Sequence, residues 1–185
     1  MSRFKILAAN PRRSLAALAT VLVAVGITGA SGASFTASTA NPSNTFTAGT
    51  LTMTNSSNAA AILTASNMRP ADPATVGTVD IKNTGSLSGV FTLAKGAIAD
   101  SDGSFPMSGK LDVILTDCGL DSNCALGVNP VLYTGTLAAM PASIALGTFA
   151  AADQHRYQFS VALDTTADNN YQGDNSVVPF TWNAS

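Results

Sequence analysis

The sequence contains no glutamate and only one histidine, His155, and all eleven acidic residues are aspartate. A zinc protease needs several histidines and a carboxylate base around one metal. An EF-hand calcium loop ends in a glutamate. The composition therefore excludes both sites. Asp100 and Asp102, in the stretch DSDG, begin like a calcium loop. We interpret them as solvated loop residues and His155 as a surface residue, and we expect no cofactor, with calcium as the open alternative.

Positive charge is also scarce, because the chain has nine lysines and arginines among 185 residues. Four of them lie within the first 13 residues, which leaves 9 − 4 = 5 basic residues against eleven acidic ones in the rest. Nucleic acid is therefore excluded as a partner, since phosphate binding requires clustered lysine or arginine.

The N-terminal residues have the pattern of a signal peptide. Basic residues precede an apolar run at 15–27, which is shorter than the roughly 20 residues that span a bilayer. Small residues follow, and Ser31-Gly32-Ala33 is typical of a cleavage site. We predict a signal helix within residues 1–33 and cleavage between Ala33 and Ser34, so that the membrane holds the chain only before cleavage. An uncleaved membrane anchor is the alternative.

The two cysteines, Cys118 and Cys124, enclose only five residues. In an exported chain this spacing predicts a small disulfide loop, which contributes about 2 kcal/mol in the chain-entropy model. A metal site would need more soft ligands than two cysteines and one histidine supply.

Beyond residue 44 the sequence alternates between apolar and polar residues, as strands with one buried face do. The clearest case is residues 156–163, in which Tyr157, Phe159, Val161 and Leu163 share one face. Pro179 removes a hydrogen-bond donor from the last strand, which predicts an edge or a bulge there. About eight strands are expected, at residues 45–54, 74–83, 89–95, 110–116, 131–139, 142–149, 156–163 and 177–183.

Strands with one buried face pack against each other in an all-β, antiparallel, jelly-roll-like β-sandwich. We assign this fold to residues 45–185. Residues 140–146 are expected to include a short helical turn. One histidine formally permits a Ser-His-Asp triad, but no G-x-S-x-G context accompanies it. The residues alone thus indicate an exported β-sandwich without visible catalytic machinery.

Three segments together resemble the TasA/camelysin family. They are SFTASTANPSNTFTAGTLTM at residues 34–53, SNMRPADPATVGTVDIKNTGSLSGVFTL at 66–93, and YQFSVALDTTADNNYQGDNSVVPFTWNA at 157–184. The segments follow the family order and cover most of the chain after residue 33. Ala71, where the family usually has glycine, and Pro179 depart from the pattern. The short loop between the two cysteines is not part of it.

The resemblance implies a signal peptide removed by a SipW-type signal peptidase and a secreted protein, extracellular or on the cell surface. It also implies a jelly-roll domain and self-association into biofilm-matrix fibres. In such fibres the N-terminal segment of each subunit completes a sheet of its neighbour. Camelysin gives the family a second label, that of a cell-surface metallopeptidase.

Residues 34–44 are therefore a candidate donor strand, with Phe35 as its anchor. Phe35 is the only large apolar side chain between the cleavage site and Phe46. An unpaired sheet edge of another copy could accept this segment. A disordered tail, or a strand that pairs within its own domain, remains an alternative.

Two other functions stay open. The metallopeptidase reading would have to build its metal site from aspartate, which suits calcium better than catalytic zinc. An adhesin-like binding module would use the loops rich in aspartate and asparagine, as a monomer.

The cleavage site gives the first prediction. We expect intact-mass measurement of the exported protein to give a chain that starts at Ser34. A chain that keeps residues 1–33 and stays in the membrane fraction would instead support the uncleaved anchor.

Overall fold

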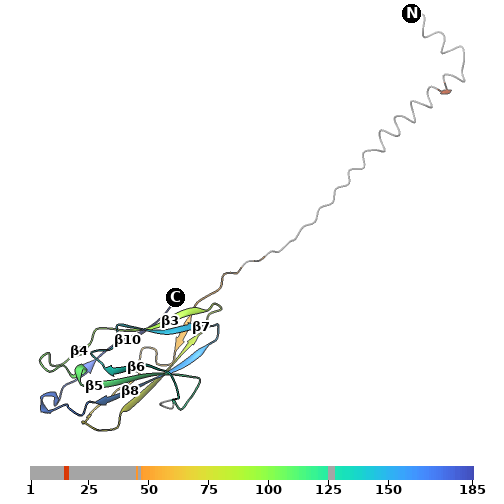
Figure 1. Cartoon of the computed structure of the whole chain (residues 1–185). Helices are drawn as coiled ribbons and strands as arrows, with labels where there is room; N and C mark the ends of the chain where they lie inside the picture. Colours follow the sequence, from red (N-terminus) through yellow and green to blue (C-terminus); the bar gives the residue numbers. More distant parts are fainter. Residues whose placement is uncertain (1–14, 17–44, 46, 125–127) are drawn as a thin grey trace, which may run out of the picture. The chain divides into compact units, whose positions relative to one another are not determined.

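The computed structural model describes residues 15–16, 45, 47–124 and 128–185 (Figure 1). The chain divides into two units, Met1–Phe46 and Thr47–Ser185. In the first unit, Leu15 and Ala16 are helical. The rest of the predicted signal peptide, the cleavage site at Ala33 and Ser34, Phe35 and the whole of residues 34–44 lie outside the described residues. None of the described helices is long and apolar enough to span a membrane.

The second unit is built on a five-stranded antiparallel sheet with the strand order β1-β2-β8-β5-β6. Strands β2 and β5 lie on either side of β8, and a β-bulge interrupts the pairing of β5 with β8 between Asp117 and Gly119. On the outer face, Arg156 donates two hydrogen bonds to Asp80. The strands are β1 Met53–Asn55, β2 Thr75–Asn83, β5 Leu111–Gly119, β6 Val131–Thr136 and β8 Gln154–Leu163.

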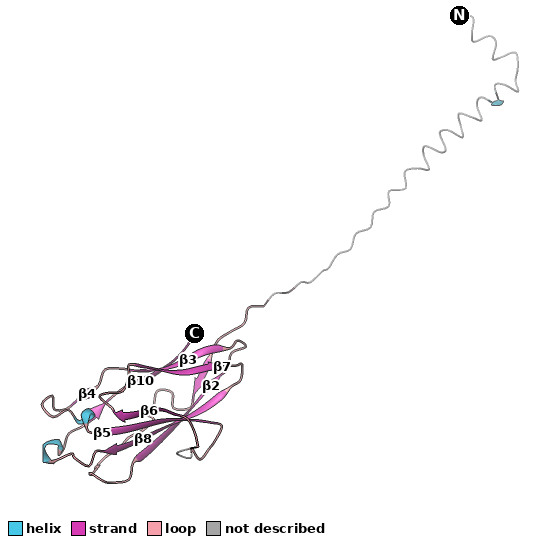
Figure 2. Cartoon of the chain, in the orientation of Figure 1, coloured by secondary structure: helices cyan, strands magenta, loops and turns pink. Residues whose placement is uncertain are grey.

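A second antiparallel sheet, with the order β10-β3-β7, lies opposite the first (Figure 2). Its strands are β3 Gly89–Lys95, β7 Ser143–Phe149 and β10 Phe180–Ala184. A small third pair joins β4 Ala99–Asp100 to β9 Ser176–Val177. Two short 3-10 helices, η1 Met107–Gly109 and η2 Asn169–Tyr171, lie in the loops.

The core lies between the two larger sheets. Aromatic rings meet across it: Tyr157 contacts Trp182, and Phe159 contacts Phe180, each pair with ring centroids 5.0 Å apart. Both contacts join β8 to β10. Alternation produces this arrangement, because every second residue of β2, β3, β5 and β8 points inward. The buried apolar residues include Val79, Ile81, Phe91, Leu93, Val113, Leu115, Tyr157 and Phe159.

One buried polar residue, Asn83, ties the two sheets together at one end. Its side chain is fully buried and donates hydrogen bonds to the carbonyl oxygens of Leu87, Phe149 and Ala150. Its Oδ1 atom accepts from the backbone N–H of Gly85 at 2.9 Å. Asn83 thus fixes the turn between β2 and β3 and holds the end of β7 against it.

The all-β, antiparallel sandwich is confirmed, with ten strands among the described residues where about eight were expected. The extra strands are the two-residue pair β4 and β9, and the expected final strand divides at Pro179 into β9 and β10. Two details were wrong. The expected strand at 45–54 is reduced to Met53–Asn55, and residues 143–146 belong to β7, not to a helical turn.

Replacing Asn83 with alanine should lower the free energy of unfolding by about 3 kcal/mol, because buried carbonyl groups would lose their donor. Asn183, an exposed residue of β10, is the matched control. We expect Asn183→Ala to change stability by less than about 0.5 kcal/mol. Urea unfolding of the two variants makes the comparison, and an equal effect in both would contradict this role of Asn83.

Candidate functional site

A large groove opens between the two sheets of the second unit. Its volume is about 1890 Å³, well above the roughly 300–1,000 Å³ of a small-molecule pocket. Residues 53–70 and 167–182 supply most of its lining, and the inner faces of β5 and β8 add largely buried apolar side chains beside β10. The apolar side chains there include Leu111, Val113, Leu137, Phe159, Val161 and Leu163.

One wall of the groove is the chain segment that contains β9 and β10. Val90 and Ser185 exchange both backbone hydrogen bonds, and Gly96 donates to the carbonyl of Pro179. By alternation, residues 181 and 183 also face β3. The backbone N–H and C=O groups of residues 180, 182 and 184 therefore point away from β3, and no described strand pairs with that edge.

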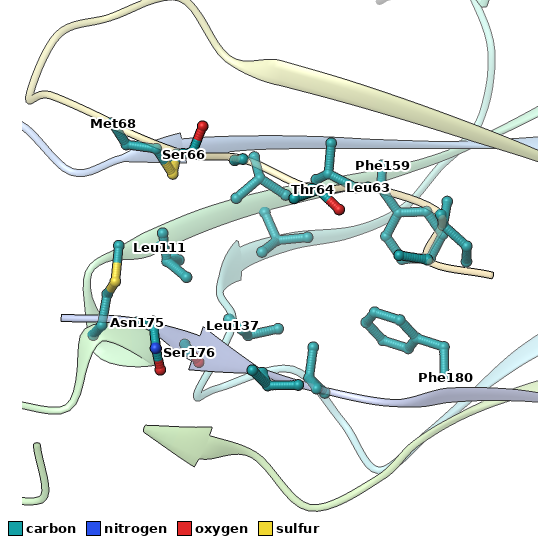
Figure 3. A pocket seen from close by; sticks show the side chains of 18 of the residues that line it. Leu63, Thr64, Ser66, Met68, Leu111, Leu137, Phe159, Asn175, Ser176 and Phe180 are labelled. Atoms are coloured by element: carbon teal, nitrogen blue, oxygen red, sulfur yellow. The ribbon is translucent and has the colours of Figure 1, made fainter. Parts of the chain in front are cut away.

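The opposite wall includes residues 61–68, which cross the inner side of β2. The close approach depends on Gly77: a Cβ atom there would lie 2.3 Å from the carbonyl oxygen of Ile62. Figure 3 shows Leu63, Thr64, Ser66 and Met68 along one side of the groove. No hydrogen bond joins the backbone of residues 61–68 to any other described residue. Both walls therefore present unpaired backbone groups.

The groove is almost uncharged. Among its lining residues only Arg69, Asp168 and Asp174 carry charge. Trp182, the single tryptophan of the chain, also lines the groove, and its Nε1–H has no hydrogen-bond partner among the described residues. Figure 3 places Leu111, Leu137 and Phe159 between the two walls. This combination suits an extended, uncharged polypeptide segment that carries a large apolar side chain.

The candidate calcium residues make hydrogen bonds within their own loop. Asp100 accepts from the backbone N–H of Ser108 at 2.9 Å and from its hydroxyl at 2.7 Å. Burial alone would raise the pKa of Asp100, but the hydrogen bonds from Ser108 lower it below its ordinary value. Asp102 accepts from the N–H of Ser104. Among the described residues, no three His, Cys, Asp or Glu side chains gather as a metal site requires.

His155, expected at the surface, is partly exposed and has neighbours that the sequence did not indicate. Its ring stacks on Phe149 with centroids 4.3 Å apart, and Nδ1 lies 2.9 Å from both carboxylate oxygens of Asp117. The side chain is 32% exposed, so it belongs to the margin of the core. Burial and the Asp117 carboxylate raise the pKa of the neighbouring Tyr157.

The predicted disulfide between Cys118 and Cys124 is confirmed, with a Cα–Cα distance of 5.0 Å. Both cysteines are buried, and Leu120 between them is exposed. The disulfide closes the loop that follows β5. Neither cysteine lines the groove.

Sequence reasoning missed residues 61–66 as part of a site. The signal that could have found them is the run Ile62-Leu63-Thr64, which has high strand propensity and does not become a strand. The groove as a whole depends on the spacing between the sheets, for which the sequence carries no local pattern.

No protein-family model matches the chain, and no curated protein gives a significant match.

Gly77 tests how closely residues 61–66 are held against β2. We expect Gly77→Ala to lower the free energy of unfolding by about 2 kcal/mol, because the new Cβ would clash with the backbone of Ile62. Gly103→Ala is the matched control, since its Cβ would meet no atom within 4 Å, and it should change stability by less than about 1 kcal/mol. Thermal unfolding compares them, and equal stabilities would refute the close approach.

Proposed function

We propose that this protein is a secreted, non-enzymatic structural subunit of the TasA type that assembles into extracellular fibres. The groove of each copy receives residues 34–44 of another copy. The observation that carries this proposal is the groove itself, which joins an apolar floor to an unpaired strand edge. The resemblance of three sequence segments to the TasA/camelysin family supports it independently.

An unpaired strand edge selects an extended partner. The groups at residues 180, 182 and 184 can form a regular row of main-chain hydrogen bonds with an extended segment, which a small molecule cannot supply. A strand added there would pair with β10 and place alternate side chains on the apolar lining. The volume of the groove supports the same reading, because it exceeds that of a small-molecule site.

Residues 34–44 match these requirements in their chemistry. The segment SFTASTANPSN contains no charged side chain, as an occupant of a nearly uncharged groove should. Phe35 is its single large apolar residue, and the apolar surface that contains Leu111 and Leu137 would receive it. Fully extended, ten residues reach about 33 Å. Residues 174–184, which form the open wall, are of similar length.

The proposed contact propagates because the donor segment and the groove are different surfaces of the same chain. Such a head-to-tail contact produces an open filament unless the rotation between subunits closes a ring. Removal of residues 1–33 by a SipW-type signal peptidase would free the donor segment from the membrane. Cleavage would then control when assembly begins.

The deciding experiment compares two purified chains, residues 34–185 and residues 45–185, by negative-stain microscopy. The shorter chain keeps every residue of the described core, which lies between Leu51 and Ala184. We expect filaments from the longer chain only. Two monomeric samples would overturn the proposal and favour a binding module.

A point variant sharpens this test. We expect Phe35→Ala to reduce filament yield more than tenfold, since burial of a phenylalanine side chain contributes roughly 1.5–3 kcal/mol. Thr36→Ala is the matched control in the same segment and should assemble almost normally. Filaments of equal yield from both variants would show that Phe35 is not the anchor.

The groove also contains its own reporter. We expect a synthetic peptide of residues 34–44 to change the fluorescence of Trp182 in the 45–185 chain, because Trp182 lines the groove. Binding should depend little on salt, since neither the peptide nor most of the groove carries charge. A response that disappears at high salt would contradict the apolar mode of binding.

A further inference from the structure

A strand placed in the groove would meet an unpaired backbone on each side. Residues 180, 182 and 184 supply one row of free N–H and C=O groups, and residues 61–66 lie across the groove without a hydrogen bond to any described residue. An extended peptide has donors and acceptors along both of its edges. Pairing with β10 alone would leave the second edge of the peptide without a backbone partner.

We propose that residues 61–66 become a strand that pairs with the second edge of the incoming segment. This inference rests on the proposed function, and it adds that the acceptor has two arms instead of one. The smaller sheet would then contain five strands, in the order residues 61–66, incoming segment, β10, β3 and β7. Each sheet of the sandwich would contain five strands.

The sequence of residues 61–66, AILTAS, is suited to that change. Ile62 and Thr64 are β-branched, Leu63 is apolar, and the segment contains neither proline nor glycine. None of its residues is fully buried: three are exposed and three are partly buried. This is what we expect of a segment that lacks a strand partner. The segment thus has strand propensity but no strand neighbour among the described residues.

Two residues with left-handed backbone conformations flank this segment. Ala59 has a φ angle of 58° and Asn67 one of 53°. Such angles are unfavourable for a residue with a Cβ atom, above all for alanine, and they occur where a chain turns sharply. Residues 60–66 therefore form one unit between two turns. Rotation at Ala59 and Asn67 alone could bring that unit toward an incoming strand.

The consequence for a fibre is that the donor segment becomes an interior strand. An edge strand can leave after one row of hydrogen bonds opens, whereas an interior strand must lose two rows. The arm formed by residues 61–66 would therefore determine how long a subunit stays in the fibre.

Hydrogen exchange tests the two arms separately. Amide exchange is measured in filaments of residues 34–185 and in the monomeric 45–185 chain. We expect alternate amides of residues 61–66 to exchange about 100-fold more slowly in the filaments. The outward amides of residues 180, 182 and 184 should slow as well. Protection of both sets supports the two-armed acceptor.

Two other outcomes are distinct from this one. Protection of residues 180, 182 and 184 without residues 61–66 would overturn the second arm and leave the proposed function standing. Protection of neither set would overturn both proposals, because no strand would have entered the groove.

A pair of variants gives an independent reading. Neither Leu63 nor Thr64 has a backbone hydrogen bond to the described residues. Proline at either position therefore removes no backbone hydrogen bond from the free domain. Because neighbouring residues of a strand face opposite ways, only one of the two N–H groups would face the incoming segment. We expect one of Leu63→Pro and Thr64→Pro to speed dissociation of the 34–44 peptide at least tenfold, followed by Trp182 fluorescence. Unchanged dissociation in both variants would overturn the second arm.

Discussion

The unequal width of the two sheets is the constraint on which the rest of the structure depends. The three strands on one side cover only part of the five on the other, and a groove lined in part by β5 and β8 remains between the sheets. The same inequality leaves the outer edge of β10 without a neighbour among the described strands. The apolar surface and the unpaired edge therefore have a single origin. A separate segment of polypeptide, placed beside β10, would satisfy both.

The domain can fold with this groove open because interactions elsewhere hold its strands together. Asn83 satisfies the carbonyl groups where β2, β3 and β7 meet, and the contact of Tyr157 with Trp182 holds β8 against β10. The disulfide fixes a loop away from the groove. The interactions that stabilise the domain and the groove thus belong to different parts of the molecule.

Much of this fold could be predicted from the sequence, and the site could not. Alternation at Tyr157 and Phe159 revealed a buried face, and Pro179 marked the break in the last strand, because both signals are local. The disulfide followed from the spacing of two cysteines. The groove was missed because it depends on the number of strands in each sheet. The contact of His155 with Asp117 could not be predicted, because the two residues are 38 positions apart along the chain.

The groove lining has a consequence for how such a protein can evolve. Leu111, Val113 and Phe159 belong to the hydrophobic core and also line the groove. A mutation that reshapes the groove for a different occupant therefore also removes packing from the subunit itself. Residues 34–44, the proposed donor, belong to the other unit of the chain. Under the proposed assembly, partner preference should diverge between related chains through the N-terminal segment, while the groove stays nearly constant.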